Sequence, residues 1–279
     1  VATGVRREFP WRRYAMSLVR WSPFDAAFSL AETFFGDRPA RGFASSAWAP
    51  RVDITEDAES YTGAAYIFVE HGSGNNAIIV APGAAGRIAV SDIETRADLI
   101  RGADIFITQL EQPMAAAHRA LEIARSGGVK TILNPAPAAE IPPEMLALCD
   151  YVTPNESEAE GITGITVTSV SDAERAADAL LERGVGAAII TLGENGALYR
   201  DPRQTVHVPA YQAGDVVETT GAGDAFNGAL ATALARGTDA IDAVRFGCAA
   251  AGISVTRPGT APSMPSLSEI ETLDSSYDS

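Results

Sequence analysis

The sequence reads Glu218-Thr219-Thr220-Gly221-Ala222-Gly223-Asp224-Ala225-Phe226-Asn227-Gly228 near its carboxyl end, and this stretch is the most informative in the chain. It places small residues and then an aspartate where an extended segment is expected to turn into a helix. Small residues let backbone N–H groups approach a ligand, and a helix start adds unpaired donors and the positive end of a dipole. Such a turn can hold the charge that builds up in phosphoryl transfer, with Asp224 as the base for a substrate hydroxyl. A glycine-rich turn that only begins a helix is the alternative.

Upstream of this turn, short apolar runs alternate with helical patterns from about residue 62. We expect strands at residues 104–108, 129–133, 151–153 and 187–192, and helices at 113–126 and 171–183. Hairpins are expected at 62–81 and between 197–199 and 206–208, and two long alanine-rich helices, 223–235 and 240–256, are expected to close the chain. Apolar strands that alternate with helices predict an α/β fold with a mostly parallel sheet covered on both faces.

Polar residues follow the expected strands at the points where they end. The clusters are Gln109-Leu110-Glu111, Asn134-Pro135-Ala136-Pro137, Pro154-Asn155-Glu156-Ser157-Glu158 and Thr191-Leu192-Gly193-Glu194-Asn195-Gly196. Ligands of open α/β sheets bind at the carboxyl ends of the strands. We therefore expect these clusters and the start of the helix at Asp224 to form one rim.

Composition narrows the classes of partner. The 279 residues carry a formal net charge of −15, which argues against binding to nucleic acid or to anionic membranes. A nucleotide needs only a local positive potential and stays open. The chain has only two cysteines, Cys149 and Cys248, and neither a membrane-length apolar run nor a signal-peptide pattern, so a reducing cytoplasm is the expected compartment.

The clusters resemble motifs of the ribokinase (PfkB) family of carbohydrate kinases over about residues 52–272. The stretch from Glu218 to Gly228 is similar to the carboxyl-terminal signature of that family. Support comes from Asn134-Pro-Ala-Pro, Thr153-Pro-Asn-Glu-Ser-Glu-Ala-Glu, the cluster that begins at Thr191, and Val255-Thr-Arg-Pro-Gly-Thr-Ala-Pro-Ser. The resemblance implies a ribokinase-like three-layer fold for residues 52–279, with a small β lid at about 62–81 and an atypical or missing amino-terminal part.

The resemblance also implies roles for individual residues. Asp224 is implied as the catalytic base that binds the reacting sugar hydroxyl, and the N–H groups of Gly221, Ala222 and Gly223 are implied as an anion hole. Glu111 would hold another sugar hydroxyl. The nucleotide would be bound by Asn155, Thr191, Leu192, Gly193, Glu194, Asn195, Gly196, Gly223 and Cys248.

Two cations are implied in the same way. Glu158, together with Asn155, would organise Mg²⁺ through water, since Mg²⁺ keeps water and phosphate ligands. A K⁺ site would use side-chain or carbonyl oxygens of Glu218, Thr220, Ser254, Arg257, Gly259 and Ser263. Because the family usually has Asp at the position of Glu218, the affinity for K⁺ or its activating effect is expected to differ.

The implied activity is ATP-dependent phosphorylation of D-ribose to D-ribose 5-phosphate, with Mg²⁺ required and K⁺ activating. Fructose or a nucleoside as acceptor stays open, as does a defective kinase that binds nucleotide without turning over sugar. The family often dimerises through its lid, so a homodimer is also implied.

Structural alternatives remain for several of these residues. Without the resemblance, Glu111 is a charge at a helix start, and Asn155 and Glu158 are caps of the helix that they precede. Cys248 on an alanine-rich helix is a small buried apolar side chain. These readings compete with the functional ones until the geometry is known.

Residues 1–51 form an atypical segment of uncertain fold. They contain Trp11, Trp21 and Trp48, which are all the tryptophans of the chain, and eight arginines against four acidic residues. The Asn-x-Asp and Gly-Gly-Lys-Gly-Ala-Asn patterns with which the family contacts sugar do not occur there, and Lys130 is the only lysine. We therefore expect weak sugar binding, with slow ATP hydrolysis competing with transfer.

Overall fold

The computed structural model describes residues 63–69 and 76–277, so the segment of residues 1–51 lies outside the described residues. The described strands are β1 (Ala64–Val69), β2 (Asn76–Ala81), β3 (Ile105–Thr108), β4 (Lys130–Leu133), β5 (Tyr151–Val152), β6 (Ala187–Thr191), β7 (Ala197–Arg200) and β8 (Thr205–Val208). The described α-helices are α3 (Val90–Glu94), α4 (Ala97–Arg101), α5 (Met114–Ser126), α6 (Pro143–Leu146), α7 (Glu156–Thr163), α8 (Val170–Glu182), α9 (Ala222–Ala235), α10 (Ala240–Ser254) and α11 (Leu267–Tyr277). Short 3₁₀ turns lie at Gly83–Arg87, Gly193–Asn195 and Ala261–Ser263.

The main sheet has the strand order β3-β4-β5-β6-β7-β8. The strands from β3 to β6 pair in parallel, and β7 and β8 are added in antiparallel orientation. Parallel neighbours need a crossover between them, and helices supply it after β3, β4 and β5. The expected mostly parallel sheet is confirmed, and the carboxyl ends of its first four strands lie at one edge.

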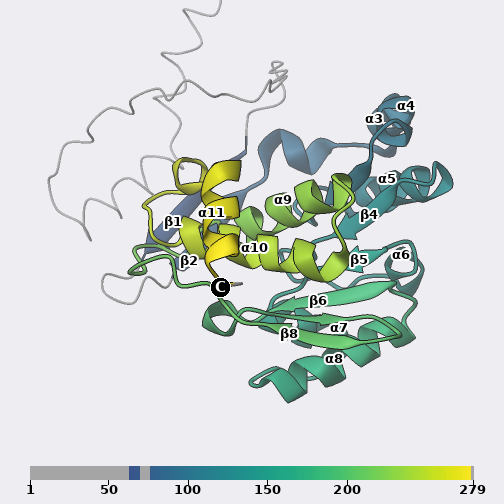
Figure 1. Cartoon of the computed structure of the whole chain (residues 1–279). Coiled ribbons are helices and arrows are strands. Elements are labelled where there is room, and N and C mark those ends of the chain that lie inside the picture. The colour runs from purple at the N-terminus through teal and green to yellow at the C-terminus, as the bar shows by residue number, and fades with distance from the viewer. Residues whose placement is uncertain (1–62, 70–75, 278–279) are drawn as a thin grey trace, which may run out of the picture. The chain divides into compact units, whose positions relative to one another are not determined.

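Helices cover both faces of this sheet, as Figure 1 shows for α9 and α10 on one side and α7 and α8 on the other. Neighbouring residues of the inner strands alternate between two cores. Leu133 and Ile190 pack with α5, α7 and α8, whereas Ile132 and Ile189 pack with α9 and α10. All four are fully buried, so adjacent residues of these strands are apolar because both faces of the sheet are covered.

A separate two-stranded sheet forms the expected hairpin. β1 and β2 pair in antiparallel register from Ala64 opposite Ala81 to Val69 opposite Asn76. The turn between them, residues 70–75, lies outside the described residues. The hairpin prediction is confirmed for its strands.

The expectation that two alanine-rich helices close the chain is wrong. A further helix, α11, follows them and packs against α10, with Ile270 only 6% exposed. The Tyr211 hydroxyl donates to Asp274 Oδ1 at 2.5 Å, which ties this helix to the segment after β8. The helix α11 is rich in serine, threonine and acidic residues and has only a narrow apolar stripe. Its sequence pattern is therefore weak, and packing against α10 decides where the helix lies.

No helix in the part of the chain that the structure describes is both long enough and apolar enough to cross a membrane.

Candidate active site

The polar clusters that follow the strands lie in register with one another. Beyond the last residues of β4 and β5, Asn134 N–H donates to Thr108 O at 3.0 Å, and Thr153 N–H donates to Leu133 O at 2.9 Å. Thr191 N–H donates to Pro154 O at 3.0 Å in the same way. These bonds continue the parallel ladder past the strand ends, so the expected rim is confirmed.

Asp224 projects from the first turn of α9 toward this rim. Its Oδ1 accepts a hydrogen bond from Gln109 Nε2 at 3.0 Å, across 115 residues of sequence. The same Nε2 group donates to Asn134 Oδ1 at 3.0 Å, and Asn134 Nδ2 donates to Thr153 O at 2.8 Å. Asp224 is exposed while Asn134 and Thr153 are buried, so the carboxylate is reachable yet tied to the sheet.

A second branch ties the helix itself to the sheet. Thr153 Oγ1 donates to Asn227 Oδ1 at 2.7 Å, and Asn227 Nδ2 donates to Gly223 O at 2.9 Å. Asn227 is 5% exposed and Thr153 is 1% exposed. Buried polar groups are costly unless they are paired, and here each one is.

The helix start supplies backbone donors beside Asp224. Gly221 has φ +82°, a left-handed conformation that favours glycine, and it forms the cap of α9. Ala222 N–H donates to Thr219 O at 3.2 Å. Among the described residues, no hydrogen bond engages the N–H of Gly221, Gly223 or Asp224. Of the three expected donors, Gly221 and Gly223 are therefore available and Ala222 is engaged, while Asp224 adds a further N–H group.

Glu111 lies on the same loop as Gln109, exposed to solvent. Within the described part of the chain its carboxylate makes no hydrogen bond or ion pair, so it remains available for a ligand. Sequence reasoning grouped Gln109 with Glu111 but gave a role only to Glu111. The signal that could have found Gln109 is its place directly after the strand, where side chains of parallel strands meet.

The expected nucleotide loop runs from the end of β6 into β7. Leu192 and Gly196 are buried, whereas Gly193, Glu194 and Asn195 are exposed. Gly196 has φ +87°, and an added Cβ would lie 2.1 Å from Val208 O. His207 Nε2 donates to Asn195 O at 2.7 Å. The loop is therefore held by β8 and presents its middle to solvent.

Asn155 and Glu158 form a capping box at the start of α7. Asn155 Oδ1 accepts from Glu158 N–H at 2.9 Å, and Glu158 Oε2 accepts from Asn155 N–H at 2.9 Å. Burial raises the pKa of Glu158, and the hydrogen bond from Asn155 opposes this rise. Asn155 also forms an isolated bridge with Thr191. The structural reading of the pair is correct, and among the described residues no hydrogen bond engages Glu158 Oε1.

Cys248 lies in the core between α10 and the sheet. It is 5% exposed, and burial raises the pKa of its thiol to about 12. The cysteine therefore behaves as a small apolar side chain, as the structural alternative held. Any contact with a nucleotide would be through its apolar surface.

The residues expected to hold a monovalent cation come from two segments that the structure brings together. Glu218 Oε2 accepts from Gly259 N–H at 2.8 Å, and Glu218 N–H donates to Val255 O at 3.2 Å. The Ser254 and Ser263 hydroxyls are buried and bonded to nearby carbonyls. The set is rich in oxygen, which suits a hard cation. The described residues contain no cluster of three or more His, Cys, Asp or Glu that could hold a metal ion.

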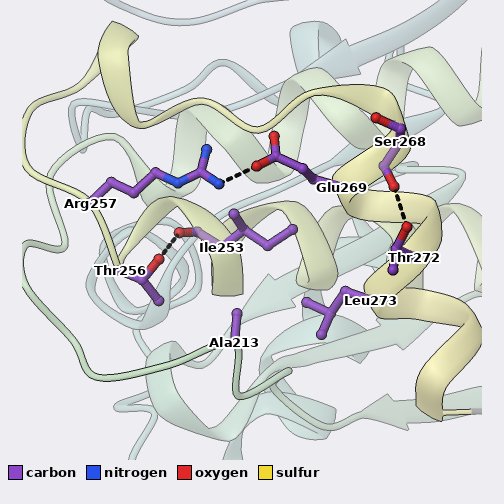
Figure 2. Close-up of a pocket in the computed structure, with 8 residues that line it drawn as sticks. All are labelled: Ala213, Ile253, Thr256, Arg257, Ser268, Glu269, Thr272 and Leu273. Carbon is purple, nitrogen blue, oxygen red and sulfur yellow. Dashed lines mark hydrogen bonds and ion pairs between the residues drawn. The ribbon is translucent and has the colours of Figure 1, made fainter.

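A cavity of about 490 Å³ lies beside this segment, away from Asp224. Figure 2 shows Ala213, Ile253 and Leu273 on its apolar side and the Arg257–Glu269 ion pair at its rim. Another, of about 310 Å³, lies at the opposite edge of the sheet, beside Lys130 and Asp201. Neither of these two cavities is lined by Gln109, Glu111 or Asp224.

Comparison with known proteins agrees with this geometry. The model of the pfkB family carbohydrate kinase matches residues 33–267, so the match begins further toward the amino terminus than residue 52. Ribokinase of Staphylococcus aureus is 39% identical over 78% of this chain and 71% of its own length. Deoxyribokinase of Salmonella typhi is 33% identical over 86% of this chain and 78% of its own length. The structure of Arabidopsis thaliana ribokinase complexed with ribose and ATP has a TM-score of 0.69 at 29% identity, covering 77% of this chain and 70% of that one.

Proposed function

This protein belongs to the pfkB family of carbohydrate kinases, and from that premise we propose that it phosphorylates D-ribose to D-ribose 5-phosphate. As a member of the family it is an ATP-dependent sugar kinase, and its cofactors are ATP and Mg²⁺. The choice of ribose is supported by its similarity to ribokinases and by the motifs around Asn134 and Ser263.

The observation that supports the chemistry most is the arrangement around Asp224. One carboxylate oxygen is held by Gln109, and the other accepts no hydrogen bond among the described residues. The N–H groups of Gly223 and Asp224 lie in the same helical turn and find no acceptor in the described part of the chain. A base and an anion site are therefore adjacent, as a phosphoryl transfer requires.

In this proposal Asp224 Oδ2 takes the proton from a sugar hydroxyl while the oxygen of that hydroxyl forms a bond to the γ-phosphorus of ATP. The bond between that phosphorus and the bridging oxygen breaks, and ADP leaves. The N–H groups of Gly223 and Asp224 donate to the transferring phosphoryl oxygens, and the positive end of α9 adds to this stabilisation. Mg²⁺, when bound, neutralises the phosphate charge that these donors do not.

Other residues are proposed to bind and orient the ligands. Glu111, whose carboxylate makes no hydrogen bond or ion pair within the described residues, would accept from a second sugar hydroxyl. The loop of residues 191–196 would contact the nucleotide, with Asn155 and Glu158 ordering water around Mg²⁺. K⁺ would lie between the segments around Glu218 and Gly259. It would thereby hold the residues that directly precede α9 in place.

We also propose a cellular compartment, the classes of partner and an oligomeric state. The two cysteines are buried and free, which fits a reducing cytoplasm. The formal net charge of −15 argues against binding to nucleic acid or to an anionic membrane, because like charges repel. A homodimer through the β1–β2 hairpin is proposed because a lone two-stranded sheet is marginally stable in water. Light scattering at micromolar concentration tests it, and a monomeric mass would refute it.

The test of function is ADP release with D-ribose, Mg²⁺ and K⁺, run beside a sugar-free control and an Asp224→Asn variant. We expect ribose-dependent turnover in the native protein and a loss of roughly 100-fold or more in the variant, because general base catalysis contributes that much. Replacing K⁺ by tetramethylammonium should lower the rate. No ribose-dependent turnover, with ATP still bound, would mean a defective kinase.

The similarity to a deoxyribokinase supports 2-deoxy-D-ribose as a second candidate acceptor. The two sugars differ only by the 2-hydroxyl, so a site that bonds this hydroxyl discriminates strongly against the sugar that lacks it. Comparing kcat/KM for ribose, 2-deoxyribose, fructose and adenosine separates the candidates. A preference for fructose or adenosine would overturn the assignment to a pentose.

A further inference from the structure

We propose that Gln109, Asn134, Thr153 and Asn227 form a positioning relay that sets the base Asp224 at a fixed place relative to the donors of the α9 turn. The relay consists of the hydrogen bonds described above, and it joins three strand ends to one helix. It rests on the proposed function, in which Asp224 is the base.

The direction of each bond in the first branch follows from its buried end. Thr153 O is a backbone carbonyl and can only accept, so Asn134 must present its NH₂ group to it. Asn134 Oδ1 then faces Gln109, whose NH₂ group supplies both a bond to Asn134 and a bond to Asp224. The relay therefore always offers a donor to Asp224 Oδ1, which leaves Oδ2 for the substrate proton.

The second branch starts from the same threonine. Thr153 Oγ1 donates to Asn227 Oδ1, and Asn227 Nδ2 donates to Gly223 O, one residue before the base. Thr153 is 1% exposed and directly follows the last residue of β5. One residue of the sheet thus holds both the base, through its carbonyl, and the helix turn that carries the anion donors, through its hydroxyl.

The physical need for such a relay follows from the exposure of Asp224. An exposed aspartate samples several rotamers, and a base that points away from the acceptor hydroxyl contributes nothing. A misplacement of about 1 Å at a reacting centre can cost roughly 100-fold in rate. Gln109 is half-buried and anchored to a buried asparagine, so it can hold the carboxylate where a solvent molecule cannot.

Two variants of Gln109 are decisive. Gln109→Leu removes the NH₂ donor. Gln109→Glu keeps the size and shape of the side chain but places a carboxylate oxygen against the two acceptors Asn134 Oδ1 and Asp224 Oδ1. Gln112→Leu is the matched control, because Gln112 lies on the same loop and donates to Thr108 Oγ1 and Gln109 O without touching Asp224. In steady-state assays, we expect kcat to fall about 10- to 100-fold in both Gln109 variants. The KM for ATP should stay within about two-fold, since the nucleotide loop is separate, and the control should keep kcat within about three-fold.

A role in packing alone would spare Gln109→Glu or would lower kcat equally in the Gln112 control, and either result would overturn the relay. A second measurement does not depend on the sugar. Crystal structures of the native protein and of Gln109→Leu should show the Asp224 carboxylate held in the first and displaced or mobile in the second. Absence of ribose turnover in the native protein would refute the proposed function alone, and the two crystal structures would then decide the relay. If the Asp224 side chain lies in the same place in the crystal structures of the native protein and of Gln109→Leu, the relay is refuted.

Discussion

Replacement of Thr153 by valine tests the anchor of the site by a change of one atom. Thr153 is 1% exposed, and its Oγ1 donates to Asn227 Oδ1 at 2.7 Å. Valine keeps the shape of threonine but cannot donate a hydrogen bond. Asn227 Oδ1 then lacks its donor, and Asn227 is only 5% exposed. Leaving a buried acceptor unsatisfied costs about 1–3 kcal/mol.

The added methyl group offsets part of this cost, by up to about 0.8 kcal/mol for a buried carbon. With the full offset, the net loss in the free energy of unfolding is about 0.2–2.2 kcal/mol, which lowers Tm by up to roughly 9 °C in a protein of this size. Urea unfolding followed by circular dichroism measures it, provided that refolding is shown to be reversible.

Thr232→Val is the matched control for this change. Thr232 lies on α9, is exposed, and bonds only to the carbonyl of Gly228 one turn earlier. Its free energy of unfolding should change by less than about 0.5 kcal/mol. If Thr153→Val is as stable as the native protein while the control is also unchanged, the buried bond to Asn227 does not exist in solution and the anchor fails.

Two further predictions concern the loop and the carboxyl-terminal segment. Gly196→Ala should lower the free energy of unfolding by more than about 2 kcal/mol, because the left-handed backbone and the carbonyl of Val208, 2.1 Å from the added Cβ, both oppose a side chain; an unchanged urea midpoint would refute this loop geometry. The hydrogen bond from Arg257 is the largest cause that lowers the pKa of Glu269 from 4.5 to about 2. A depressed pKa means stability that is fully present above about pH 4.5 and is lost as the pH falls through 2. Glu269→Gln should therefore lower the urea midpoint at pH 7, modestly because the pair is exposed, and have a much smaller effect at pH 2. An equal effect at both values would show that the pair contributes no charge-dependent stability.

The layered sheet could be read from the sequence because its strands are apolar on both faces. Ile189 and Ile190 point into different cores, and a run of this kind has no polar side to expose. The helices α8 and α9 were predicted within two residues because a capping residue or a glycine marks each start, at Ser169 and Gly221. Such signals are local, so no partner in space is needed to recognise them.

The helix α11 and the short helices α3, α4 and α6 were not predicted. Ile270 is buried only because α10 lies against it, and a stripe this narrow carries little signal. The same limit applied to the capping box of Asn155 and Glu158, which the sequence allowed both as caps and as ligand residues. Its geometry confirmed the caps, and the ligand role remains a proposal.

The sequence by itself determined the fold class and the family, and it indicated Asp224 as the proposed base, because these follow from patterns along the chain such as the run from Glu218 to Gly228. Only the tertiary structure decided that Gln109 rather than Glu111 touches Asp224, and that Ala222 N–H is engaged while Gly223 N–H is not. These contacts join segments as far as 115 residues apart. They depend on how three strand ends and one helix start are placed in register, and hydrogen bonds act only over about 3 Å, so composition and spacing along the chain carry no record of them.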